Sequence, residues 1–207
     1  LVRDMTGKTI EFIFDFGSPN AYLSWKVLPA LAERTGAGIR IVPCLLGGIF
    51  KITGNQAPTL AFGGIKGKME YERLEMARFI KKHRLDRFRM NPHFPVNTLL
   101  LMRGMIAAAD LGIERAYIDA GLRAMWEDGQ KMDDPAIFVE AMHAYGLDGE
   151  TIIARTQDQS VKDRLAQNTA AAAERGVFGI PTFFVGDEMF FGKERLGQVE
   201  ELLLATD

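Results

Sequence analysis

Ser18 and Pro19 stand where a strand pattern ends and a helix pattern begins. Residues 10–16 before them are rich in β-branched and aromatic side chains that alternate, which is typical of a mostly buried strand. Serine often caps a helix, and proline fits the first turn because its missing N–H has no helical partner there. A helix N-terminus also attracts anions. Ser18 is therefore a cap alone, or a cap that also stabilises a thiolate brought in by a ligand.

A second candidate site is the pair Ile180-Pro181, which precedes the apolar run Thr182–Val185. Pro181 either opens a strand in the ordinary way, or is cis and holds the backbone of Ile180 extended beside the helix that Ser18 begins. An extended backbone of this kind can pair with a peptide-like ligand through its N–H and C=O groups.

A third candidate is the turn Phe191-Gly192-Lys193-Glu194, at the start of the last predicted helix. Glu194 either favours the helix dipole from the first turn, or is a carboxylate that binds an ammonium group of a ligand.

Composition argues against several classes of function. The 207 residues include 25 basic and 27 acidic side chains, so the net charge of −2 favours no nucleic acid partner. Charged residues interrupt every apolar stretch before the roughly 20 residues of a membrane span, and we expect no membrane association. The single cysteine, Cys44, cannot form an internal disulfide, which fits a reducing, cytoplasmic compartment. The three histidines are scattered without metal-ligand spacing, so we predict no metal site.

The two ends of the chain carry the strand signals. Ile39–Cys44 follows the first helix as a second strand, and a strand–helix–strand unit predicts a parallel pair. Near the other end, Gly186-Asp187 separates two short apolar runs and predicts a hairpin, because both residues tolerate positive φ. The last helix is expected from about residue 193 to residue 205.

The middle of the chain is helical in pattern. The predicted helices are Met69–His83, Thr98–Leu111, Arg115–Glu127, Pro135–Tyr145 and Gln159–Arg175. This order of elements (β-α-β, a helical block, β-β-α) predicts an α/β thioredoxin-like fold with a large all-helical insertion. Residues 1–50 and 176–207 would form the thioredoxin-like domain, and residues 51–175 the helical insertion. In that fold a Cys-Pro-x-Cys redox pair begins where Ser18 stands, and Ala21 occupies its second cysteine position.

Several longer motifs occur in one chain and in one order. They are Ser18-Pro19, Leu46-Gly47-Gly48-Ile49-Phe50-Lys51, Phe94-Pro95-Val96-Asn97, Met102-Arg103-Gly104, Met125-Trp126-Glu127-Asp128-Gly129 and Gly176–Leu196. In these motifs the sequence resembles the 2-hydroxychromene-2-carboxylate isomerases, which are kin of kappa-class glutathione transferases in the DsbA-like branch. The resemblance covers nearly the whole chain. It implies a glutathione-dependent isomerisation of an aromatic carboxylate in a cytoplasmic homodimer, with trans-o-hydroxybenzylidenepyruvate as the product.

The resemblance also implies a role for each site residue. Ser18 is the catalytic residue whose hydroxyl bonds to the glutathione thiolate. The residues implied to bind glutathione are Lys51, Ile180, Pro181, Phe191, Gly192, Lys193 and Glu194, and the residues on the substrate side are Asn97 and Arg103. Two positions depart from the family pattern, because Glu194 stands where Asp is common and Gly17 where a bulkier apolar residue is common.

Two alternatives remain open from the sequence. A kappa-like glutathione transferase would release the conjugate, and a non-catalytic thioredoxin-fold module would use the Pro181 groove for peptides. A disulfide oxidoreductase is disfavoured, because Cys44 is the only thiol and lies outside the helix start.

Overall fold

A four-stranded sheet organises the molecule, in a computed structural model that describes residues 8–205. The strands are β1 (Thr9–Phe14), β2 (Gly38–Pro43), β3 (Thr182–Val185) and β4 (Glu188–Phe191), and their spatial order is β2-β1-β3-β4. β1 pairs in parallel with β2, and the β3–β4 hairpin adds antiparallel strands on the other side of β1. The predicted parallel pair and hairpin are both confirmed.

The first helix follows β1 through a tight turn. Helix α1 (Pro19–Thr35) has Ser18 as its N-cap and ends at Gly36, which is left-handed with φ 70°. β1 ends at Phe14, two residues earlier than the pattern predicts. The chain leaves the strand there because the side chain of Asp15 turns back to accept a hydrogen bond from the backbone N–H of Gly17.

Helices fill the chain between the two groups of strands. They are α2 (Leu46–Thr53), α3 (Pro58–Phe62), α4 (Lys68–His83), α5 (Leu99–Asp110), α6 (Glu114–Trp126), α7 (Pro135–Ala144), α8 (Gly149–Arg155) and α9 (Gln159–Glu174). The five predicted helices are confirmed, while α2, α3 and α8 are additional and short. The predicted last helix divides into a 3₁₀ turn, η1 (Lys193–Arg195), and α10 (Leu196–Leu204).

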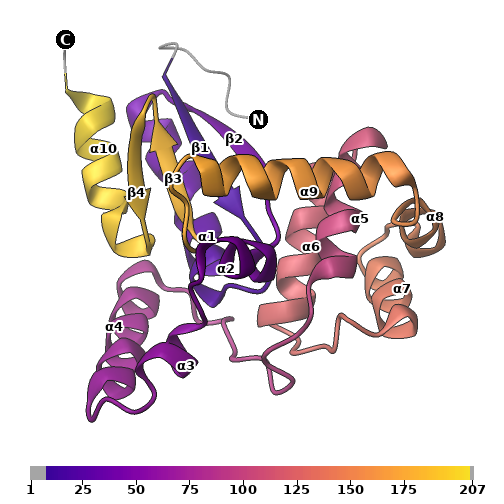
Figure 1. The fold of residues 1–207 in the computed structure, drawn as a ribbon, viewed down its shortest axis with the longest axis horizontal. Helices are drawn as coiled ribbons and strands as arrows, with labels where there is room; N and C mark the ends of the chain where they lie inside the picture. The colour runs from indigo at the N-terminus through magenta and orange to yellow at the C-terminus, as the bar shows by residue number, and fades with distance from the viewer. Residues whose placement is uncertain (1–7, 206–207) are drawn as a thin grey trace.

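Figure 1 shows how these helices surround the sheet. Helix α10 lies beside β4, α5 to α8 gather on the side away from α10, and α3 and α4 project from the body. The long α9 runs between the sheet and α8, and it contacts both β2 and α2. The division of the chain at residues 50 and 175 stays a prediction. Within residues 8–205, no helix is both long and apolar enough to cross a membrane.

A row of aromatic side chains joins the sheet to the helical block. Phe12 stacks on Phe183 of β3 with ring centroids 4.9 Å apart, and Phe14 meets Phe16 edge-on at 4.9 Å. Phe16 then packs edge-on against Tyr117 of α6. The backbone carbonyl of Phe16 also accepts a hydrogen bond of 2.8 Å from the indole N–H of Trp126. The segment that leads to Ser18 is therefore fixed to α6 by apolar contacts and by a polar one.

Replacement of Gly121 by alanine tests this junction. A Cβ atom at Gly121 would lie 2.6 Å from Cε1 of the buried Phe16 ring. Gly121→Ala should lower the free energy of unfolding by about 1–3 kcal/mol, because the close-packed ring cannot move without strain. Gly47→Ala in α2 is the matched control, since a Cβ there meets nothing within 4 Å. It should be neutral or stabilising by up to about 1 kcal/mol. Equal stabilities of the two variants in chemical denaturation would contradict this packing.

Candidate active site

Ser18 is buried, with 5% of its surface exposed, and its hydroxyl takes part in two hydrogen bonds. Its Oγ accepts the backbone N–H of Ala21 at 3.2 Å, which is the helix cap that the sequence predicts. The hydroxyl also donates to the backbone carbonyl of Ile180 at 2.9 Å, across 162 positions of the chain. Ser18 therefore both caps α1 and contacts the second candidate segment.

The peptide bond between Ile180 and Pro181 is cis in the structure. The carbonyl of Pro181 accepts the N–H of Gly192 at 2.9 Å, and the hydroxyl of Thr182 donates to the carbonyl of Gly179 at 2.7 Å. The structure thus brings together the three segments that the sequence singled out. Ser18 contacts Ile180, and Pro181 contacts the turn that carries Glu194.

Lys193 and Glu194 form an ion pair in that turn. The Lys193 side chain is only 3% exposed, and its ammonium group lies 5.6 Å from the centre of the Phe79 ring on α4. The Glu194 side chain is 44% exposed, so its carboxylate is accessible to a ligand. The left-handed φ of 93° at Gly192 shapes the turn that presents this carboxylate.

Phe191 ends β4 beside the same turn. Its ring packs against Phe178 at 4.7 Å between centroids, and a Cβ at Gly179 would lie 2.9 Å from the ring. The backbone carbonyl of Phe178 accepts a hydrogen bond of 2.7 Å from the side chain of Asn55. This bond ties the loop after α2 to the segment before Pro181, and Lys51 is exposed at the C-terminal end of α2.

The two residues expected on the substrate side are Asn97, which lies just before α5, and Arg103, which lies within it. Asn97 is exposed, and its side-chain oxygen accepts the N–H of Leu99 at 3.0 Å. Arg103 is half-buried on α5, and its Nε is buried without a hydrogen-bond partner among residues 8–205. No hydrogen bond within the same range joins Arg103 to Ser18 or Ile180. An unpaired guanidinium N–H is suited to a carboxylate or hydroxyl oxygen of a ligand.

The sequence reasoning missed Asp15 and Thr98. Asp15 is fully buried behind the turn that leads to Ser18, and its carboxylate accepts hydrogen bonds from Gly17, Leu46 and Thr98. Burial raises the pKa of Asp15, although these three donors act against the shift. A charged residue at the end of a buried strand was the signal for this site. The same packing explains why glycine occupies position 17, because a Cβ atom there would lie 3.2 Å from Cγ2 of Thr98.

A comparison with protein families identifies the fold. The model of the DSBA-like thioredoxin domain matches residues 9–204. The chain belongs to this family.

Two relatives and one solved structure are similar to this chain over nearly their whole lengths. A 2-hydroxychromene-2-carboxylate isomerase of Pseudomonas sp. (strain C18) is 28% identical over 193 residues, which are 92% of this chain and 88% of the relative. Human glutathione S-transferase kappa 1 is 24% identical over 217 residues, which cover 95% of this chain and 91% of the relative. A solved structure of 2-hydroxychromene-2-carboxylate isomerase has a TM-score of 0.80 at 27% identity, and 94% of each chain is covered.

More distant solved structures share the fold alone. The structure of a probable DsbA oxidoreductase from Streptomyces coelicolor has a TM-score of 0.71 at 19% identity, and 97% of this chain is covered. The fold class predicted from the sequence is therefore confirmed.

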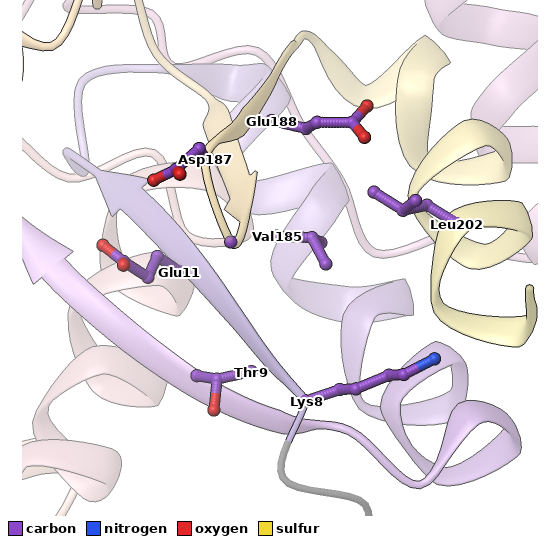
Figure 2. Close-up of a pocket in the computed structure, with 8 residues that line it drawn as sticks. Lys8, Thr9, Glu11, Val185, Asp187, Glu188 and Leu202 are labelled. Atoms are coloured by element: carbon purple, nitrogen blue, oxygen red, sulfur yellow. The ribbon is translucent and has the colours of Figure 1, made fainter. Parts of the chain in front are cut away.

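One surface cavity lies away from the candidate site. It has a volume of about 620 Å³ and lies at the opposite end of β1 from Ser18. Figure 2 shows its lining, which comes from the start of β1, the β3–β4 hairpin and α10. Glu11 in this lining is already paired with Arg40 and Arg175.

Cys44 is buried next to Asp15, away from the helix start. Its Sγ lies 3.4 Å from the backbone carbonyl of Asn168. Burial, with a smaller contribution from the Asp15 charge, raises the pKa of the Cys44 thiol to about 12. Thiol reactions proceed through the thiolate, so this cysteine is poorly suited to redox exchange.

We therefore expect Cys44 to be inert in the native protein. With a pKa of about 12, only about one thiol in ten thousand is ionised at pH 8, whereas an ordinary exposed cysteine is about one quarter ionised. An aromatic disulfide reagent should titrate no thiol in the folded protein over minutes, and one thiol per chain in guanidinium chloride. Rapid titration of the folded protein would contradict the buried position.

Proposed function

We propose that this protein is a glutathione-dependent isomerase. It would convert 2-hydroxychromene-2-carboxylate, or a related intermediate of aromatic breakdown, to trans-o-hydroxybenzylidenepyruvate. Relatives with that isomerase name match it over nearly their whole lengths. The observation that carries the proposal is the hydrogen bond from the Ser18 hydroxyl to the carbonyl of Ile180. It places a hydroxyl donor, a helix N-terminus and a peptide acceptor in one place.

Charged groups of the candidate site would meet the two ends of glutathione. Lys51 would meet the glycyl carboxylate, and the backbone of Ile180, held by Pro181, would pair with the cysteinyl part. The turn Phe191–Glu194 would hold the γ-glutamyl end, where the half-exposed carboxylate of Glu194 can accept the ammonium group.

Ser18 would lower the pKa of the bound thiol. Its hydroxyl can turn from the carbonyl of Ile180 to a sulfur anion, while the N–H of Ala21 continues to hold the oxygen. The positive end of the α1 dipole favours the same anion. Glutathione would supply a nucleophilic thiol that adds to the conjugated substrate and is eliminated after the ring has opened and rotated.

Arg103 and Asn97 would contact the substrate. The unpaired Nε of Arg103 is a ready donor to the substrate carboxylate. Asn97 is exposed one residue before Thr98, the N-cap of α5, so it lies on the same helix start.

We also propose that the protein is a cytoplasmic homodimer. Large apolar side chains are exposed on and around α2, α3 and α4, and they are Ile52, Leu60, Phe62, Ile65, Tyr71 and Leu74. Large apolar side chains that are exposed in one chain can be buried in an interface, and symmetric dimers are the commonest oligomers.

A spectroscopic assay tests the isomerase proposal. The protein is mixed with 2-hydroxychromene-2-carboxylate, and the absorbance of the open trans product is followed with and without glutathione. We expect many turnovers per molecule of glutathione and no net loss of thiol. Stoichiometric loss of thiol would instead identify a kappa-like transferase. Absence of glutathione binding in calorimetry would contradict both enzymes and favour the peptide-binding module.

Removal of the Ser18 hydroxyl tests its role in the reaction. Ser18→Ala should lower kcat by about 10²–10³-fold, because a donor to the reacting anion is lost. It should also cost roughly 1–2 kcal/mol of stability through the lost cap. Ser24→Ala is the matched control, since Ser24 is buried on the same helix and its hydroxyl has no partner among residues 8–205. This control should retain full activity. A fall in kcat of less than about threefold in Ser18→Ala would reduce Ser18 to a helix cap.

A further inference from the structure

Asp15 is a buried carboxyl group that the proposed reaction does not use. It is fully buried, and the three groups that donate to it are all neutral. Its Oδ1 accepts the N–H of Gly17 at 2.8 Å, and its Oδ2 accepts the N–H of Leu46 at 2.7 Å. The hydroxyl of Thr98 also donates to the carboxylate. Burial of a carboxyl group is costly unless hydrogen bonds satisfy it, so a set of three donors is a built arrangement.

Each donor belongs to a different segment of the candidate site. Gly17 lies in the turn that ends at Ser18, and the N–H of Ser18 also reaches the backbone carbonyl of Asp15 at 3.3 Å. Leu46 is the first residue of α2, the helix that ends near Lys51. Thr98 is the N-cap residue of α5, which carries Arg103. The Asp15 carboxyl group therefore joins the three segments that present the side chains of Ser18, Lys51 and Arg103.

The start of α2 depends on Asp15 in particular. The N-cap residue of α2 is Leu45, whose side chain makes no cap hydrogen bond. The Asp15 carboxylate replaces that cap from another element, and a negative charge is favourable at a helix N-terminus. Without this contact, an N–H at the start of α2 would lose its partner and the helix would be less well fixed.

The surroundings hold the carboxyl group in place. A Cβ at Gly17 would lie 3.3 Å from Oδ1 of Asp15, so the turn is packed closely against it. The Cys44 thiol is near enough for the Asp15 charge to raise the pKa of that thiol. Phe14 and Phe16 on either side of Asp15 in the chain are both fully buried. Close packing therefore leaves the Asp15 carboxyl group little room to move, and the three segments bonded to it are held in one arrangement.

We propose that Asp15 is a positioning residue that sets the spacing between Ser18, Lys51 and Arg103. It acts through the Ser18 turn, the start of α2 and the start of α5, and it touches neither glutathione nor substrate. The spacing matters because small displacements of groups around a reacting centre are costly in rate. This inference rests on the proposed function, in which Ser18 meets the thiol, Lys51 the glycyl carboxylate and Arg103 the substrate.

Asp15→Asn is the variant that tests the proposal. An amide keeps the size of the side chain and one oxygen, but its NH₂ group must face one of the two backbone N–H donors. One of the three contacts is therefore lost. We expect about a tenfold weaker affinity for glutathione in calorimetry and about a tenfold lower kcat. Amide hydrogen exchange should become faster at Leu46 and in the first turn of α2.

Thr35→Val is the matched control. Thr35 is buried at the other end of α1, roughly 25 Å from Ser18 at the rise of an α-helix, and its hydroxyl bonds to carbonyls of its own helix. It should lower the thermal midpoint without a change in glutathione affinity or kcat. If Asp15→Asn behaves like this control at a temperature where both are folded, Asp15 is only structural and the proposal fails.

The pKa of the bound thiol separates positioning from a direct charge effect. Thiolate absorbance in the ultraviolet, followed against pH, should give a higher pKa for bound glutathione in Asp15→Asn, because Ser18 and the start of α1 are displaced. A lower pKa would mean that the Asp15 charge merely opposes the thiolate, and it would overturn the proposal.

If the unaltered protein binds no glutathione, the proposed function fails, and this inference fails with it. Binding that is equal in the unaltered protein and in Asp15→Asn refutes this inference alone.

Thr98→Val provides a second test if Asp15→Asn does not fold. Valine keeps the shape of threonine and removes a single donor to the carboxylate. Because Thr98 begins α5, this change should reduce kcat/KM for the chromene substrate by about threefold to tenfold and leave glutathione affinity unchanged. An unchanged kcat/KM would contradict the positioning role.

Discussion

The hydrogen bond from the Ser18 hydroxyl to the carbonyl of Ile180 is the contact on which the candidate site depends. A bond of this kind contributes only about 1 kcal/mol to stability, so it does not hold the fold together. Its importance is geometric, because it fixes the start of α1 against the backbone before Pro181. Pro181 in turn accepts the N–H of Gly192. Through these two bonds the helix start, the backbone of Ile180 and the Glu194 turn become neighbours.

The local parts of this arrangement could be predicted from the sequence because their signals are local. Ser18 and Pro19 are a good helix start, Gly36 a good helix end, and Gly186-Asp187 a good hairpin turn, and the structure has all three. The short helices α2, α3 and α8 were missed because five to eight residues contain too few turns for a clear helical period. The contact between Ser18 and Ile180 spans 162 positions, and no spacing rule reaches that far. It could be expected only from the predicted fold and from the resemblance to a family.

Asp15 could not be assigned from its neighbours in the sequence for a related reason. In an alternating strand pattern, a charged residue between Phe14 and Phe16 is expected to face solvent. In the structure the strand has already ended, and the side chain is buried because Gly17, Leu46 and Thr98 donate to it. Two of these donors are more than thirty positions away in sequence, so the partners that make burial tolerable are visible only in three dimensions.

The Lys193–Glu194 pair contacts helix α4, and this contact bears on the proposed binding of the γ-glutamyl end of glutathione. A buried ammonium group without a counter-ion would be costly, so Glu194 first serves the protein by neutralising Lys193. In the proposed complex the same carboxylate would also meet the ligand ammonium, and two cations would then share one anion. The face of the Phe79 ring, on α4, offsets part of that competition because it attracts the Lys193 ammonium from the other side. In the proposed complex, the affinity of the Glu194 turn for an amine would therefore be set partly by α4, which lies far from this turn in the sequence.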